Sequence, residues 1–295
     1  MKIGFIGLGI MGKPMCKNLL KNGFEVVICA HKSKEALNEL VAAGATAAAN
    51  PREVAKQTEI IITMLPNSPQ VKSVILGVDG IVEGIRAGTI VADMSSIAPL
   101  ISRELSIELA KKGAELLDAP VSGGEPKAIE GTLSVMVGGK KEVFDKAFPV
   151  LKAMAASVVL TGDIGAGNVT KLANQVIVAL NIAAMSEAFV LASKCGVAPE
   201  LVYQAIRGGL AGSTALDAKA PLMLDRKINP GFRINLHIKD LANALETAHE
   251  VGAPLPLTAA VMETLQALKV DGFGDADHGA IVRYYEKLAK IEVKR

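Results

Sequence analysis

The sequence lacks a charge bias, a long apolar run and a set of paired cysteines, and each absence excludes a class of protein. Its 295 residues carry 32 basic and 30 acidic side chains, so the net charge is only +2. A nucleic-acid-binding surface needs clustered positive charge, which this chain does not have. The longest uncharged apolar stretch of its second half, 172–186, is interrupted by amides and is shorter than a bilayer span of about 20 residues. We therefore expect neither a nucleic-acid partner nor a membrane partner.

Targeting and metal-binding signals are missing as well. Met1 is followed almost at once by a predicted strand, which leaves no room for a signal peptide and favours a cytoplasmic location. The cysteines, Cys16, Cys29 and Cys195, are odd in number and lack the spacing of metal ligands, so we interpret them as reduced core thiols. The four histidines are scattered along the chain. A metal site is therefore not expected.

The chain contains two halves with different patterns. Up to residue 162, short β-rich runs alternate with amphipathic helical segments, as a parallel sheet with crossover helices requires. The predicted strands are 2–6, 25–29, 60–64, 89–93, 115–118, 133–137 and 158–160. The predicted helices 11–21, 34–43 and 102–112 are followed by Gly23, Gly44 and Gly113, which we expect to adopt left-handed C-cap conformations. We predict an α/β, Rossmann-type doubly wound sheet over residues 1–162.

The second half is predicted to be all-helical. Residues 168–195 contain neither glycine nor proline and are bounded by Gly167 and Gly196, which predicts one long helix. Periodic apolar segments continue to the C-terminus without a convincing strand. We therefore expect an all-α C-terminal domain, 163–295, joined to the first domain by the long helix.

A glycine-rich turn follows the first predicted strand. Gly7, Gly9 and Gly12 have the G-x-G-x-x-G spacing, with Leu8, Ile10 and Met11 between them. The first glycine permits a tight turn, the second lets the backbone approach a pyrophosphate, and the third lets the following helix pack closely on the strand. We interpret the turn as a clamp for a nicotinamide dinucleotide. A turn that binds no nucleotide is the alternative.

The end of the second predicted strand leaves the choice between NAD(H) and NADP(H) open. An acidic residue there would accept a hydrogen bond from the ribose 2′-OH, but the sequence has Ala30, followed by His31 and Lys32. These last two side chains could bind a 2′-phosphate, so we expect NADP(H) at least to be tolerated. They could equally be solvated loop residues.

Two groups of residues suggest a site for a small acid. Ser122, Gly123 and Gly124 offer backbone N–H groups beside a hydroxyl, which suits a carboxylate, although a structural turn would look the same. Lys171 stands in the first turn of the long helix and could donate the proton that a carbonyl gains during hydride reduction. Its alternative role is that of a solvated helix end. Asn174 and Gln175 follow at three and four residues, on the same helix face.

Two further positions are ambiguous from the residues alone. Ser96 follows the strand 89–93 at the sheet edge where ligands bind, but together with Pro99 it also fits an ordinary turn. Lys239 precedes Asp240 and either forms a local ion pair with it or reaches the cofactor.

The order of these motifs resembles the β-hydroxyacid dehydrogenase family along essentially the whole chain. The resemblance rests on the runs 4–12, 118–124 and 165–167, and on Ala128, Gly131, Lys171, Phe232, Lys239 and Asp240. It implies a reversible, NAD(P)H-dependent reduction of a small carboxylate semialdehyde to a hydroxy acid. The runs 64–69, 93–99 and 171–181 most resemble members that convert tartronate semialdehyde to D-glycerate in glyoxylate metabolism.

The resemblance also assigns roles to residues. It implies Lys171 as the general acid, Ser122, Gly123 and Gly124 as ligands of the substrate carboxylate, and Ser96 as a contact of both substrate and cofactor. It implies cofactor contacts for Leu65, Pro66, Asn67 and Lys239. The long helix would build a homodimer or homotetramer interface.

Some alternatives stay open. Many family members have asparagine four residues after the lysine, where this chain has Gln175, so either Asn174 or Gln175 could hold the substrate. The substrate could also be 3-hydroxyisobutyrate or succinic semialdehyde, because a single methyl group changes discrimination by only about 1–3 kcal/mol. A non-catalytic nucleotide-binding scaffold is a third hypothesis, and a proton donor opposite a carboxylate site disfavours it.

Overall fold

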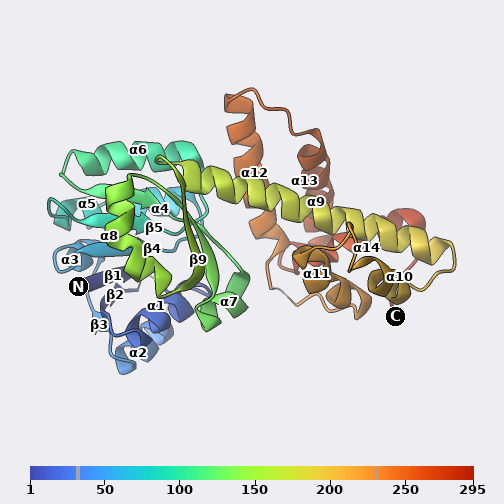
Figure 1. Cartoon of the computed structure of the whole chain (residues 1–295), viewed down its shortest axis with the longest axis horizontal. Coiled ribbons are helices and arrows are strands. Elements are labelled where there is room, and N and C mark those ends of the chain that lie inside the picture. The colour runs from blue at the N-terminus through green and yellow to red at the C-terminus, as the bar shows by residue number, and fades with distance from the viewer. Residues whose placement is uncertain (31–33, 230) are drawn as a thin grey trace. The chain divides into compact units, whose positions relative to one another are not determined.

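The structure is a computed structural model that describes residues 1–30, 34–229 and 231–295. The chain divides into two compact units, Met1–Lys171 and Leu172–Arg295. Figure 1 traces the path of the chain through both.

The first unit is built on a sheet that has nine strands within the described residues. Its order is β3-β2-β1-β4-β5-β6-β8-β7, with β9 paired to β8. The strands are β1 (Lys2–Ile6), β2 (Glu25–Cys29), β3 (Thr46–Ala47), β4 (Ile60–Thr63), β5 (Ile90–Asp93), β6 (Glu115–Asp118), β7 (Val121–Ser122), β8 (Leu133–Gly138) and β9 (Ala155–Gly162). Every pair from β3 to β6 is parallel, whereas β8 runs antiparallel to β6 and β7. The order β3-β2-β1-β4-β5-β6 is that of doubly wound dinucleotide-binding sheets, so the predicted fold class is confirmed.

Helices cover both faces of this sheet, and the residues of its central strands are buried almost without interruption (Figure 1). On one face, Ile3 and Phe5 pack with α1 (Gly12–Lys21), α2 (Lys34–Ala42), α7 (Gly124–Glu130) and α8 (Lys141–Lys152). On the other, Ile6 and Ile61 pack with α3 (Pro51–Ala55), α4 (Ser68–Leu76), α5 (Ile81–Gly84) and α6 (Pro99–Ala110). Each fully buried aliphatic or aromatic side chain contributes about 1.5–3 kcal/mol. Because successive strand residues face opposite sides, continuous burial along a strand requires a helical layer on each face of the sheet.

Helix α9 (Ala166–Lys194) contains the boundary between the two units. By length and composition it could cross a membrane, with a mean hydropathy of 1.9, a property that core helices of soluble proteins share. It begins two residues before the predicted helix 168–195 and ends one residue before it, so Gly167, expected to precede the helix, lies in its first turn.

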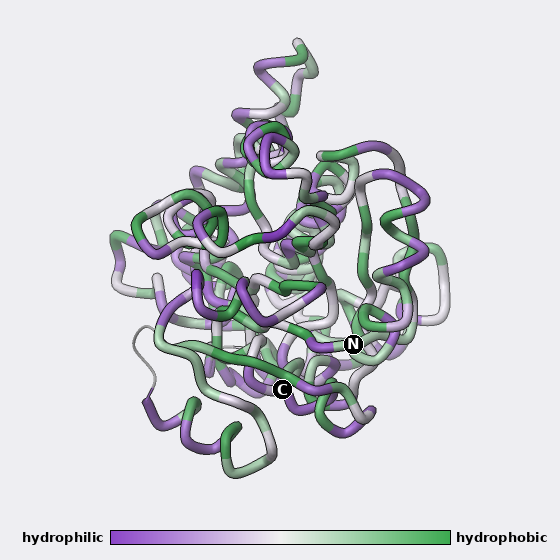
Figure 2. The backbone as a smooth tube through the Cα atoms, turned by 90° about the vertical axis from the view of Figure 1, so that its left-hand side faces the viewer, coloured by the Kyte–Doolittle hydropathy of each residue, from purple (hydrophilic) through white to green (hydrophobic). Residues whose placement is uncertain are grey.

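The second unit is helical throughout its described residues, as predicted. Its elements after α9 are α10 (Pro199–Ile206), α11 (Thr214–Leu224), α12 (Ile234–Glu250), α13 (Pro256–Leu268), the π-helical turn η1 (Lys269–Phe273), the 3-10 turn η2 (His278–Ile281) and α14 (Val282–Ala289). Phe189, Leu241, Leu265 and Ile281 form part of one buried core. In α12 the buried residues Ile234, Ile238 and Leu241 recur every three or four positions between more exposed ones. The tube of Figure 2 shows hydrophobic and hydrophilic residues alternating along the chain. This alternation is the pattern of amphipathic helices around a shared core.

Most predicted elements of the first unit are confirmed within one or two residues, although α6 begins three residues before its prediction of 102–112. The strands β3 and β7 were not predicted, because two residues are too few to show a period. Strand β9 is longer than its prediction of 158–160 and largely exposed. The glycines after the predicted helices, Gly23, Gly44 and Gly113, have φ values of +83°, +106° and +71°, so the predicted left-handed caps are confirmed.

Candidate active site

The glycine-rich turn places two glycines where a side chain could not fit. Gly7 has φ of +107°, and a Cβ there would lie 2.2 Å from the carbonyl oxygen of Met64. A Cβ on Gly12 would lie 1.8 Å from the carbonyl oxygen of Gly7, because α1 starts directly against the turn. The chain therefore turns from β1 into α1 with backbone contacts at Gly7 and Gly12 that are too close for any side chain.

Gly9 differs from its two neighbours in the turn. A Cβ built on it meets nothing within 4 Å, so its surroundings are open. Met11 precedes α1 without a side-chain cap, and the amide of Lys13 donates to the Gly9 carbonyl at 3.0 Å. Open space beside a glycine at an uncapped helix N-terminus is the arrangement that accepts a pyrophosphate. The residues present therefore fit a dinucleotide, with Leu8 buried and Ile10 exposed on either side of Gly9.

The ends of β4 and β5 are joined by buried hydrogen bonds. The Thr63 hydroxyl donates to Asp93 Oδ1 at 2.7 Å, and the amide of Ser95 approaches the same oxygen at 3.2 Å. The Leu65 amide donates to the Ser95 hydroxyl at 2.9 Å. This chain of contacts fixes the segment that carries Leu65, Pro66 and Asn67 and the turn that carries the half-buried Ser96.

The segment after β6 presents the predicted carboxylate ligands. Ser122 pairs with Ser134 in the sheet, and Gly123 and Gly124 follow with φ values of +135° and +69°. The Asn18 amide donates to the Ala128 carbonyl at 2.7 Å and anchors the following helix. Positive φ at two successive residues is a conformation that glycine adopts at no steric cost, so the turn after Ser122 depends on these two glycines.

Lys171 is held close to these segments by two buried side chains that the sequence reasoning did not assign to the site. Asp118 accepts from the amides of Gly165 and Asn168, each at 2.7 Å. The Asn168 side chain accepts from the amide of Ile97, next to Ser96, at 3.1 Å and donates to Ser102 Oγ at 3.1 Å. The first turn of α9 is therefore tied to the ends of β5 and β6, and Lys171, only 8 % exposed, stands one turn further on.

The charge of Asp118 makes a testable prediction about stability. Burial raises its pKa from 3.8 to about 6, although the amides of Asn168 and Gly165 act in the opposite direction. Between these two values the unfolded chain releases a proton that the folded chain retains, so stability falls as pH rises from about 4 to 6 and then levels off. We expect this slope, on the order of 2–3 kcal/mol, to be missing in Asp118→Asn.

Urea unfolding of both proteins at several pH values measures the effect of Asp118. The unmodified protein should lose stability relative to Asp118→Asn across that window. Parallel curves, or a relative gain as pH rises, would contradict the assignment of the raised pKa to Asp118.

In the second unit, three side chains form a continuous polar chain. The Asn174 amide nitrogen donates to Gln175 Oε1 at 2.9 Å, and Gln175 Nε2 donates to Asp240 Oδ2 at 2.6 Å. Lys239 Nζ lies 2.7 Å from Asp240 Oδ1. The local ion pair considered from the sequence is therefore present. Gln175 is buried and both ends of its amide are engaged, whereas Asn174 is half-buried.

The structure places most, but not all, of the predicted residues. His31 and Lys32 lie outside the described residues, so the expected contact with a 2′-phosphate has no structural counterpart here. Within residues 1–30, 34–229 and 231–295, no group of three or more His, Cys, Asp or Glu side chains could hold a metal ion. Cys16 and Cys29 are free and buried, as predicted, and burial raises their pKa values to about 12 and about 11. Cys195 is free but exposed, so the prediction of a core thiol is wrong there.

The residues that sequence reasoning missed, Asp93, Asp118 and Asn168, share one feature. Each is a buried polar side chain at the end of a strand or the start of a helix. The sequence offered one signal for the two aspartates: each is an acidic residue at the end of an otherwise apolar strand. A carboxylate that is buried there needs hydrogen-bond donors from other segments.

Known proteins match this chain along its length. Residues 2–162 match the NAD binding domain of 6-phosphogluconate dehydrogenase, and residues 165–285 match the NAD-binding domain of NADP-dependent 3-hydroxyisobutyrate dehydrogenase. The chain is 42 % identical to 2-hydroxy-3-oxopropionate reductase of Escherichia coli, covering 98 % of both chains. It is 39 % identical to 2-(hydroxymethyl)glutarate dehydrogenase of Eubacterium barkeri, over 99 % of this chain and 97 % of the relative. The solved structure of Mycobacterium tuberculosis 3-hydroxyisobutyrate dehydrogenase with L-serine is similar with a TM-score of 0.89 and 30 % identity, over 96 % of this chain and 98 % of that one.

Proposed function

Because the chain belongs to the β-hydroxyacid dehydrogenases, NAD(P)-dependent oxidoreductases that act on CH–OH groups, we propose that it reversibly reduces tartronate semialdehyde (2-hydroxy-3-oxopropionate) to D-glycerate. The cofactor is NAD(H) or NADP(H). The 42 % identity to the reductase of that substrate supports this choice over the other family reactions.

The observation that carries the catalytic part of the proposal is the setting of Lys171. Its side chain is 8 % exposed, and Asn168 ties its helix to the residue that follows Ser96. A solvated helix end, the alternative from the sequence, does not fit this burial. An ammonium held in a buried setting interacts more strongly with a developing negative charge than one in water does.

Each residue has a defined task in the proposed reaction. When bound, the cofactor supplies the hydride that reduces the aldehyde carbon. Lys171 donates a proton to the aldehyde oxygen as the alkoxide charge develops, and in the reverse direction its neutral amine accepts the hydroxyl proton. Ser122, Gly123 and Gly124 donate hydrogen bonds to the substrate carboxylate, and Ser96 contacts the substrate and the cofactor.

Several segments of the chain are proposed to contact the cofactor. Gly7 to Gly12 and the segment from Leu65 to Asn67 would hold the dinucleotide, which the open surroundings of Gly9 support. The buried Asn67 Oδ1, which has no hydrogen-bond partner among the described residues, would accept from it. Lys239 would contact the cofactor as well, and His31 and Lys32 its ribose.

The choice between the two amides of α9 follows from their partners. Gln175 uses its oxygen on Asn174 and its nitrogen on Asp240. A substrate contact would have to break one of these buried bonds, which costs about 1–3 kcal/mol. We therefore assign substrate binding to Asn174 and a supporting role to Gln175.

Assembly, location and domain limits are part of the same proposal. Ile177 and Leu191 on α9 are 62 % and 66 % exposed, which supports a homodimer or homotetramer interface along this helix. A cytoplasmic location and domain limits at 1–162 and 163–295 complete the proposal.

A comparison of substrates tests the proposed activity. We expect tartronate semialdehyde to give a higher kcat/KM than methylmalonate semialdehyde or succinic semialdehyde, by about ten- to a hundredfold, because both competitors lack the 2-hydroxyl and the second also has a longer chain. Nicotinamide absorbance, followed with NADH and then with NADPH, measures all three and also settles the cofactor preference. A higher kcat/KM for either of the other semialdehydes would replace the proposed substrate.

A further inference from the structure

Two histidines that lie far apart in the sequence meet inside the second unit. His237 on α12 and His278 on η2 are 1 % and 5 % exposed, and their Nδ1 atoms lie 2.9 Å apart. Both rings pack edge-on against Phe232, with centroid distances of 5.7 and 5.2 Å. The other ring nitrogen of His237, Nε2, lies 3.3 Å from the backbone carbonyl oxygen of Gln175.

These contacts determine where the protons of a neutral pair lie. A carbonyl only accepts, so His237 Nε2 must carry a proton and donate it to Gln175. The Nδ1 of a neutral His237 then has a lone pair, and His278 Nδ1 must be the donor between the rings. The assignment applies to the neutral pair, in which each ring carries one proton.

Asp277 holds the second histidine and Phe232 in place. Its carboxylate accepts from Lys219 at 2.8 and 2.9 Å and from the amides of Gly231, Phe232 and Gly279 at 2.9 to 3.0 Å. The amide of His278 in turn donates to the Phe232 carbonyl at 2.8 Å. With five hydrogen bonds from four donor groups on its buried carboxylate, Asp277 fixes the backbone on which the His278 ring is held against His237.

The contact with Gln175 connects the pair to the polar chain described above. The backbone of Gln175 accepts from His237, and its side chain links Asn174 to Asp240. Asp240 lies three residues after His237 on α12 and pairs with Lys239. Helix α12 thus contacts Gln175 of α9 twice, through His237 at its backbone and through Asp240 at its side chain.

We propose that His237 and His278 are positioning residues of the dehydrogenase reaction. Through a fixed tautomer pair they hold α12 on α9, so that Gln175 and Asp240 set the positions of the Asn174 amide and the Lys239 ammonium. The inference rests on the proposed roles of Asn174 and Lys239. A loss of register by about 1 Å at such groups can cost up to a hundredfold in rate.

The proton arrangement is tested by nitrogen-15 NMR of the imidazole rings in the full chain. We expect His237 to be the Nε2–H tautomer and His278 to be the Nδ1–H tautomer at neutral pH. This measurement needs no substrate, so it is independent of the proposed function. The opposite tautomers, or an imidazolium at either position, would overturn the inference.

Matched substitutions at His278 test the consequence for catalysis. His278→Leu removes the Nδ1–H donor, and we expect kcat to fall about tenfold while the dissociation constant of the cofactor is unchanged. His278→Asn keeps a nitrogen donor at the same place and should restore most of the rate. A His278→Leu enzyme with full kcat, or a His278→Asn enzyme as slow as His278→Leu, would overturn the positioning role.

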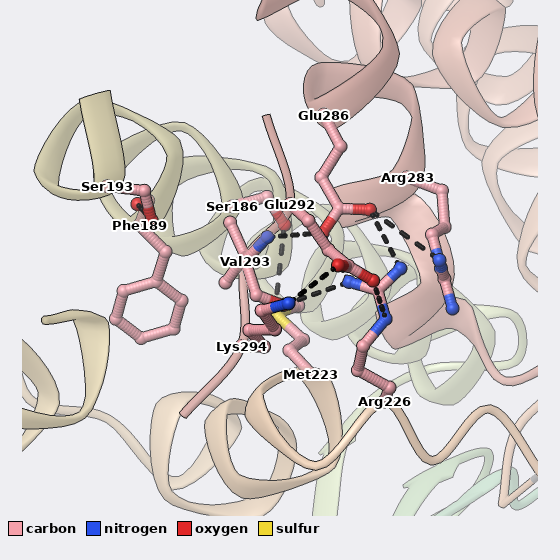
Figure 3. Close-up of polar contacts among 10 residues, drawn as sticks. All are labelled: Ser186, Phe189, Ser193, Met223, Arg226, Arg283, Glu286, Glu292, Val293 and Lys294. Carbon is pink, nitrogen blue, oxygen red and sulfur yellow. Dashed lines mark hydrogen bonds and ion pairs between the residues drawn. The ribbon is translucent and has the colours of Figure 1, made fainter. Parts of the chain in front are cut away.

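A control in the same unit separates positioning from general destabilisation. Arg226 Nη1 donates to Glu286 Oε1 at 2.6 Å, and Figure 3 shows both arginines, Arg226 and Arg283, directed at that carboxylate. Glu286→Gln weakens this cluster without touching the path to Gln175. It should lower Tm and leave kcat unchanged, and a loss of kcat in Glu286→Gln equal to that in His278→Leu would overturn the inference.

If the unmodified protein does not turn over tartronate semialdehyde, the proposed substrate fails, and the same variants are compared on 3-hydroxyisobutyrate.

Discussion

Replacement of Lys171 by methionine is expected to lower kcat about a hundred- to ten-thousandfold and to leave cofactor binding unchanged. The loss corresponds to about 3–5 kcal/mol of transition-state stabilisation. Methionine fills the buried space of the lysine stem but cannot donate a proton or compensate an alkoxide charge. The hydrogen bonds of Asp118 and Asn168 that fix the start of α9 do not involve the Lys171 side chain, so the fold should persist.

The comparison needs a control on the same helix. Lys194 is the last residue of α9 and is exposed, so Lys194→Met removes an equal charge far along the helix from the proposed chemistry. Initial rates with the preferred semialdehyde and titration of cofactor fluorescence measure the two quantities. If Lys171→Met turns over as fast as Lys194→Met, Lys171 is not the proton donor.

The strands and helices predicted for the first unit could be identified because their signals are local. Each buried strand is a short apolar run, and glycines such as Gly23 and Gly113 mark the helix ends with positive φ. The two-residue strands could not be predicted, since their pairing depends on where β2 and β8 already lie. Local sequence patterns therefore predict the longer strands and helices, whereas β3 and β7 form only because the fold brings their residues beside β2 and β8.

The candidate site was only partly predictable for a related reason. Gly7, Gly9 and Gly12 carry their function in their spacing, so the dinucleotide turn could be identified from the residues alone. The roles of Asn168 and Asp118 depend on donors and acceptors that are about 50 to 70 residues away in the chain, at 2.7 to 3.1 Å. The histidines were interpreted as scattered, and the fold brings His237 and His278 together across 41 residues. The periodicity of apolar residues along the sequence carries no information about such contacts between distant side chains.

The glycines of the turn separate folding from cofactor binding, and two alanine substitutions should show it. Gly12→Ala places a methyl group 1.8 Å from the Gly7 carbonyl oxygen, so α1 must move off the sheet. We expect a loss of about 3 kcal/mol or more in stability, seen as a Tm lower by about 6–12 °C in a thermal unfolding scan. A Gly12→Ala protein with unchanged Tm would mean that α1 can move aside without cost.

Gly9→Ala should have the opposite profile, because a Cβ at Gly9 meets nothing within 4 Å and its φ lies outside the left-handed range. The added methyl occupies the open space assigned to the pyrophosphate, so the dissociation constants of NADH and NADPH should rise about tenfold or more while Tm stays constant. Gly208→Ala, at an equally open glycine of the second unit, controls for the substitution itself. If Gly9→Ala still binds the cofactor tightly, the pyrophosphate does not lie against the Gly9 backbone, because a methyl group there would block such close contact.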